Sequence, residues 1–149
     1  PGAALFYTNY GVAAYQSGCP KEAKRLFLYA VEIYEESREY SEYPIALAYL
    51  ALFDSQEGKL EQAAERLTKA LELCDTIGSP RWKGVTIFIT WKIRQLMKEK
   101  HLNCPTIENL WPDSEEAHCI WCLSYLHQLQ PRKETREMEQ ALLDVQENH

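Results

Sequence analysis

Two stretches of the chain share one pattern and lie forty residues apart. Residues 18–33 read GCPKEAKRLFLYAVEI, and residues 58–73 read GKLEQAAERLTKALEL. Each starts with a glycine suited to a tight turn and continues with small and large apolar residues at helical spacing, while charged residues take the other positions. A sequence that repeats itself at such a distance is typical of stacked helical units.

Helical spacing extends on both sides of these stretches, and turn residues separate the segments. We expect helices over residues 3–17, 20–38, 44–57, 59–77 and 81–100, with helix ends at Gly18, Gly58 and Gly78. The β-branched residues at 85–90 would favour a strand, but their surroundings favour a long helix. After a break at 102–112, two further helices are expected, from about 114 to 130 and after Pro131.

The chain is therefore expected to be all-α, with antiparallel helix pairs stacked as a short superhelix. Its 149 residues are the size of one domain. We divide this domain, residues 1–149, into a first repeat at 3–43, a second at 44–79, a divergent third helical unit at 80–130 and a C-terminal helix at 131–149. The C-terminal helices are expected to cover the last apolar face of the stack.

Small and large residues follow one order in both repeats. The first repeat has Tyr7, Tyr10, Gly11, Ala14, Gly18, Ala23, Phe27 and Ala30, and the second has Leu47, Leu50, Ala51, Asp54, Gly58, Ala63, Leu67 and Ala70. This order resembles the tetratricopeptide repeat, in a variant with a period of about forty residues. The resemblance covers about half of the chain. Gly11 and Ala51 are expected to let the two helices of a unit approach closely, with Phe27 or Leu67 filling the space beside them. In the third unit Trp91 stands where Gly11 and Ala51 stand, so that unit diverges.

The resemblance also implies where a partner binds, in a groove formed by the first helices of successive units. Carried over by register, its residues are Leu5, Thr8, Val12, Tyr15, Gln16, Ile45, Ala48, Leu52, Ser55 and Gln56. This apolar wall suits an amphipathic helix or an extended peptide of another protein. Val12 and Leu52 do not fit the lysine and asparagine clamp of family members that bind a C-terminal carboxylate. The chain's own C-terminal helix is the other candidate occupant.

The segment 81–101 is basic, although the chain carries a net charge of −6. Lys83, Arg94 and Lys98 fall on one side of this expected helix, and we call them the basic stripe. The stripe predicts either a docking surface for an acidic or phosphate-bearing partner, RNA included, or pairing with acidic helices of the same chain. The overall acidity argues against a general nucleic-acid binder.

The cysteines and histidines favour neither a metal site nor a catalytic centre. His118, Cys119 and Cys122 form a ligand-like cluster, but a second Cys-x-x-Cys is absent, so packing is the favoured role. The five scattered cysteines favour reduced thiols in a cytoplasmic or otherwise intracellular protein. The sequence has no nucleophile signature and no glycine-rich phosphate loop. We therefore expect no enzyme activity and no cofactor.

Together these patterns predict a non-catalytic interaction module that buries a partner's peptide or helix in an apolar groove. Self-association into a homo-oligomer and binding of RNA or phosphate through 81–101 are the alternatives. No apolar run approaches the roughly 20 residues of a membrane helix, so no membrane association is expected. The start at Pro1, without methionine, indicates a piece of a larger protein.

Overall fold

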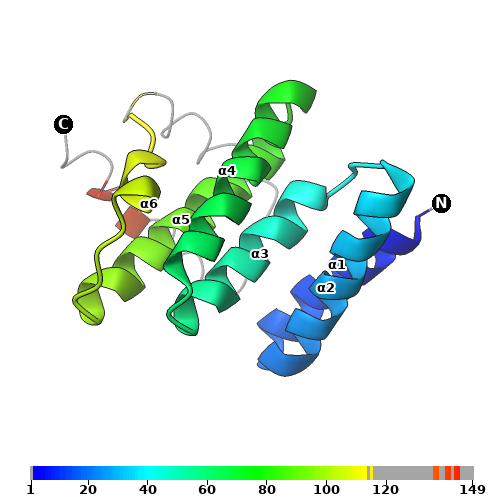
Figure 1. The fold of residues 1–149 in the computed structure, drawn as a ribbon, viewed down its shortest axis with the longest axis horizontal. Helices are drawn as coiled ribbons and strands as arrows, with labels where there is room; N and C mark the ends of the chain where they lie inside the picture. Colours follow the sequence, from blue (N-terminus) through cyan, green and yellow to red (C-terminus); the bar gives the residue numbers. More distant parts are fainter. Residues whose placement is uncertain (1, 114, 116–135, 138–139, 142, 145–149) are drawn as a thin grey trace.

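The computed structural model describes residues 2–113, 115, 136–137, 140–141 and 143–144. Helices are α1 (Ala3–Gln16), α2 (Pro20–Ser37), α3 (Tyr43–Gln56), α4 (Leu60–Ile77), α5 (Pro80–Glu99) and α6 (Pro105–Asn109). Figure 1 shows them in chain order, from α1 and α2 on the right to α5 and α6 on the left. The all-α prediction is confirmed, since the described residues form helices and connecting turns and no strand.

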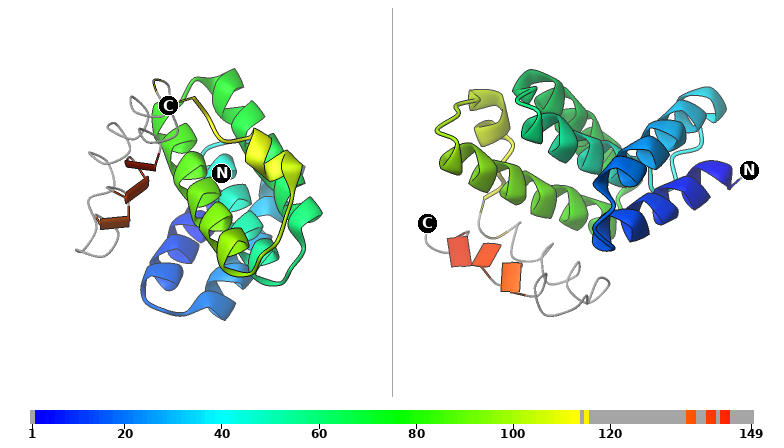
Figure 2. Two further views of the ribbon diagram at one scale, coloured as in Figure 1. Left: turned by 90° about the vertical axis from the view of Figure 1, so that its left-hand side faces the viewer. Right: turned by 90° about the horizontal axis from the view of Figure 1, so that it is seen from below.

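Two expected helices fall largely outside this description. Of the helix expected from about 114 to 130, only residue 115 is described. In the expected C-terminal helix, the described residues 136, 137, 140, 141, 143 and 144 are all helical. Figure 2 shows these C-terminal residues on the side of α5 that faces away from α6.

Glycines end the helices where the sequence predicted turns. Gly78 has a φ of 72°, and its N–H donates to the carbonyl of Cys74 over 2.7 Å, which closes α4. Gly18 and Gly58 take similar positive φ angles of 82° and 81° in the turns that follow α1 and α3. The end of α2 differs, because Arg38 takes the left-handed conformation with a φ of 57°, which is uncommon for a residue with a side chain.

A glycine in α1 allows α2 to approach closely. A Cβ atom placed on Gly11 would lie 2.8 Å from Cε1 of Phe27, closer than such atoms can pack. Phe27 is fully buried, and its ring stacks on that of Tyr49 in α3 with centroids 5.0 Å apart. The ring of Phe27 therefore fills the space that Gly11 leaves, as the repeat pattern predicted, and it ties the first helix pair to α3.

Helix α3 is the centre of the described fold. Every residue from Tyr43 to Ser55 is buried, and α3 contacts α1, α2, α4 and α5. A helix that is apolar around its whole circumference needs neighbours on all sides. Since α3 has them, the helices on either side of it are held in fixed positions around a common core.

In the described part of the chain, the long helix α5 is followed by the short helix α6. Helix α5 packs against α3 and α4, and the five residues of α6 contact α4 and α5. Ile107 of α6 lies forty residues after Leu67 and eighty after Phe27, and all three side chains have no exposed surface. One turn of helix thus places a buried apolar residue at the same forty-residue register position as Phe27 and Leu67.

Asp54 is a buried carboxylate at the position that Ala14 takes in the first repeat. Its Oδ2 atom accepts no hydrogen bond and lies 3.5 Å from the Arg66 guanidinium. Burial raises the pKa of the Asp54 carboxyl, and the positive charge of Arg66 offsets this only in part. Ionised Asp54 is therefore expected to cost stability, because a buried charge loses its hydration.

Because of this cost, the stability of the protein is expected to depend on pH. The folded state holds a proton on Asp54 at a higher pH than the unfolded state does, so the free energy of unfolding falls as pH rises through the raised pKa. We expect Asp54→Asn to be more stable relative to wild type at pH 7 than at pH 4.5, in urea unfolding at both pH values. A stability difference that does not change with pH would contradict the raised pKa.

Candidate partner-binding groove

A hollow of ≈ 250 Å³ lies where α1, α3 and α5 meet. We call it the α5 groove. Its walls come from one residue of α1, two of α3, five of α5 and one of the C-terminal segment: Tyr15, Leu52, Gln56, Trp91, Lys92, Gln95, Leu96, Glu99 and Glu137. The groove thus joins the first helices of three successive units.

Tyr15, Leu52 and Gln56 are the three predicted groove residues that line this hollow. Leu5 and Val12 are half-buried, and Ile45 and Ala48 are buried in the core. The side chains of α3 are therefore mostly enclosed by neighbouring helices, so the apolar wall expected from the register is narrower than predicted.

The two predicted hydroxyl groups are satisfied within the fold. Thr8 is fully buried, donates to the carbonyl of Ala4 over 2.9 Å and lies 3.1 Å from the Tyr34 hydroxyl. Ser55 is also fully buried and donates to the carbonyl of Leu52 over 2.7 Å. The Thr8 contact joins α1 to α2, and the Ser55 contact joins successive turns of α3. Neither hydroxyl lines the groove.

Lys92 is the charged centre of the α5 groove. Its ammonium donates to the Tyr15 hydroxyl over 3.3 Å and lies 3.1 Å from Oε2 of Glu137. It also lies 5.4 Å from the centre of the Phe88 ring. Burial lowers the pKa of Lys92, but the attraction of Tyr15 and Glu137 outweighs burial and raises this pKa overall. Lys92 therefore stays charged at neutral pH while largely enclosed.

Sequence reasoning counted Lys92 only as part of the basic segment. The forty-residue register would have placed it in the groove, because Lys92 follows Val12 and Leu52 in the same position of successive units. The position of Lys92 in the groove could therefore have been predicted by continuing the forty-residue register into the third unit.

Two further α5 side chains donate into the groove region. The indole N–H of Trp91 donates to Oδ2 of Asp144 over 2.6 Å, and the amide of Gln95 donates to the same oxygen over 3.3 Å. Trp91 stands in the register position of Gly11 and Ala51, where small residues admit a second helix. In the third unit this large residue donates instead to the side-chain carboxylate of Asp144.

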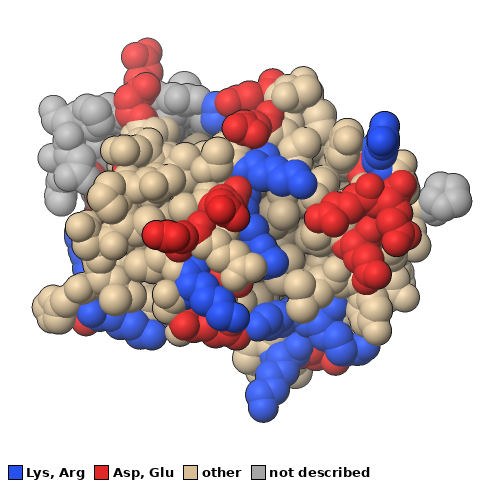
Figure 3. Space-filling model, viewed as in Figure 1, with Lys and Arg blue, Asp and Glu red and all other residues tan. Residues whose placement is uncertain are grey.

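The basic stripe is largely neutralised by acids of the same chain. Lys83 lies 2.9 Å from Asp75 of α4, and Arg94 lies 2.9 Å from Glu108 of α6 and stacks over the Trp111 ring at 4.5 Å. Lys98 is exposed. On the face shown in Figure 3, basic and acidic side chains lie next to one another in several places. This arrangement favours internal pairing over a dedicated anion-binding surface.

The weak metal candidate, His118, Cys119 and Cys122, lies outside the described residues. Within the described part of the chain, no group of three or more His, Cys, Asp or Glu side chains could hold a metal ion. Cys19, Cys74 and Cys104 are free thiols. Burial raises the pKa of Cys74 to about 11, which leaves this thiol protonated and unreactive at neutral pH.

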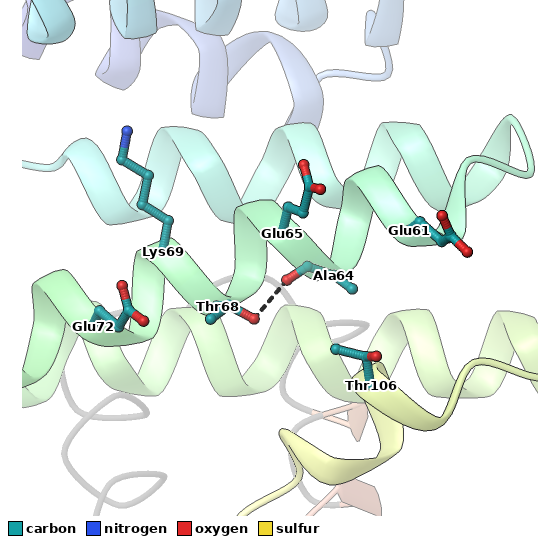
Figure 4. Close-up of a pocket in the computed structure, with 7 residues that line it drawn as sticks. All are labelled: Glu61, Ala64, Glu65, Thr68, Lys69, Glu72 and Thr106. Carbon is teal, nitrogen blue, oxygen red and sulfur yellow. Dashed lines mark hydrogen bonds between the residues drawn. The ribbon is translucent and has the colours of Figure 1, made fainter.

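A larger, open hollow of ≈ 590 Å³ lies between α4 and α6, and Figure 4 shows its residues. Its acidic residues are Glu61, Glu65 and Glu72, whose carboxylates point in different directions. The ammonium of Lys69 lies 5.1 Å from the Tyr43 ring centre, and the Thr68 hydroxyl donates to Ala64. Nothing here converges on a common point, so this surface is the solvated side of α4.

Comparisons with protein-family models, with curated proteins and with solved structures found no match. Among the described helices, none combines the length and the apolar character that crossing a membrane requires.

Proposed function

We propose that this chain is a non-catalytic, tetratricopeptide-like interaction module whose α5 groove binds a helix or peptide of another protein. The observation that carries the proposal is the groove itself, which joins α1, α3 and α5 and places Lys92 beside apolar surface of Tyr15 and Leu96. Concave sites that combine apolar surface with a few polar groups are typical ligand sites. The free thiols of the described cysteines support an intracellular setting.

Both apolar contacts and one charged group would contribute to binding of the partner. Leu96 and the ring of Tyr15 offer apolar surface, which favours burial of a partner's apolar side chains. Lys92 would fix the orientation of the partner, because a hydrogen bond to a charged, enclosed group is stronger than one between neutral groups. The RNA alternative has less support, since the chain carries a net charge of −6 and binding to phosphates rests on accumulated positive charge.

Filling the groove tests this proposal. Gln56 is exposed at the end of α3 and lines the groove, so Gln56→Trp should fill part of the hollow without touching the core. We would select helical peptides on the immobilised chain from a displayed library and measure their affinities by fluorescence anisotropy. Gln56→Trp is expected to weaken them about tenfold or more, equivalent to 1.4 kcal/mol.

The matched control is Gln62→Trp, which places the same indole on the exposed side of α4. This control should bind the selected peptides as wild type does. Equal affinities for both tryptophan variants would contradict the assignment of binding to the α5 groove.

A further inference from the structure

Described residues of the C-terminal segment lie against the α5 groove. Glu137 pairs with Lys92 over 3.1 Å, and Asp144 accepts a hydrogen bond from Trp91 over 2.6 Å. Both are helical, as is Ala141, which has no exposed surface. Spacings of four and three residues place side chains on one face of a helix. The segment therefore carries a stripe of acidic, small and acidic residues on the face that meets α5.

The donors of α5 match this stripe in spacing, and one of them, Lys92, also matches it in charge. Lys92 meets the first carboxylate, and Trp91 and Gln95 both donate to Oδ2 of the second. The side chains of Lys92 and Glu137 are only 21% and 23% exposed. Separating such a pair leaves an enclosed charge without compensation, which is costly. A groove without its C-terminal segment would therefore favour another anionic ligand over a neutral one.

We propose that the partner of the α5 groove is an acidic helix with two carboxylates seven residues apart and a small residue four positions after the first. In the chain itself, Glu137 and Asp144 of the C-terminal segment already hold the two carboxylate positions at the edge of the groove, and the partner must displace them. This inference rests on the proposed function and specifies the ligand of the same groove. While the segment holds this position the partner cannot bind. The apparent affinity for the partner therefore equals the intrinsic affinity multiplied by the fraction of time for which the groove is open.

The test uses the full chain and a labelled synthetic peptide of residues 131–149 as the probe. Glu137→Gln with Asp144→Asn in the full chain removes both charges of the attached segment but keeps its shape. We expect this double variant to bind the probe about tenfold or more tightly than wild type does, a change of 1.4 kcal/mol or more. Adding Lys92→Gln to the double variant should abolish this gain.

Equal binding of the probe to wild type and the double variant, or a gain that survives Lys92→Gln, would overturn the inference. A neutral probe, the same peptide with both carboxylates replaced by amides, separates this inference from the proposed function. If the double variant binds the neutral and acidic probes equally, acidic specificity is overturned while helix binding in the groove still stands.

Sedimentation velocity of wild type decides which copy supplies the segment. A monomer supports occupation within one chain. A dimer that dissociates on Glu137→Gln with Asp144→Asn would assign the segment to a second copy and overturn the intramolecular contact. Circular dichroism of each variant should match wild type, because the three substitutions keep side-chain size and leave the core untouched.

Discussion

Phe27→Ala is expected to lower the free energy of unfolding by about 3–5 kcal/mol, the usual range for removing a buried phenylalanine. Phe27 has no exposed surface and stacks on Tyr49, with ring centroids 5.0 Å apart. The ring of Phe27 packs directly against Gly11, where a Cβ would already be too close to it. Because Gly11 has no side chain, it cannot fill the cavity that the substitution leaves. Urea unfolding followed by circular dichroism measures the loss.

The neighbouring residue gives a matched control for this substitution. Leu28 is 43% exposed on the same helix, so Leu28→Ala should change stability by less than about 1 kcal/mol. A loss from Phe27→Ala as small as that of the control would contradict the close packing of α1 against α2.

Ile107→Ala is expected to cost about 2–5 kcal/mol, although α6 is only a short turn of helix. A helix of five residues has little stability of its own and must be held by tertiary contacts. Ile107 is fully buried in a core cluster that includes Ile93 and Met97, so truncation removes the main anchor of α6. The same urea experiment measures the effect.

Asn109→Ala is the control, because Asn109 is exposed at the end of the same short helix. It should leave stability within about 0.5 kcal/mol of wild type. If Ile107→Ala behaves like this control, Ile107 does not anchor α6 to the core.

The repeat pattern predicted most helix positions because glycines and apolar spacing are local signals. It also identified the close approach of Gly11 and Phe27. It did not predict the exposure of Phe6 and Tyr10, which are 61% and 53% exposed. Their counterparts forty residues later, Ala46 and Leu50, are fully buried, because α3 has neighbours on every side. Burial at a repeat position depends on the adjacent units, and one unit's sequence does not contain that information.

The groove could be predicted only in part for a related reason. Tyr15 and Leu52 followed from the register, but the pairing of Lys92 with Glu137 joins residues far apart in the chain. Periodicity places a residue on a face of its own helix, and it does not specify which distant segment covers that face. The same limit applies to Arg94, whose partner Glu108 lies on a helix too short to be predicted from periodicity.

The most direct test of the proposed function compares two charge reversals on α5. Lys92 lies in the α5 groove, whereas Lys98 is exposed on the basic stripe. For helical peptides selected on the wild-type chain, measured by isothermal titration calorimetry, Lys92→Glu should weaken binding about tenfold or more, since hydrogen bonds to charged groups contribute about 1.5–3 kcal/mol. Lys98→Glu should leave it unchanged. Loss of binding in Lys98→Glu with wild-type affinity in Lys92→Glu would contradict the groove and place binding on the basic stripe.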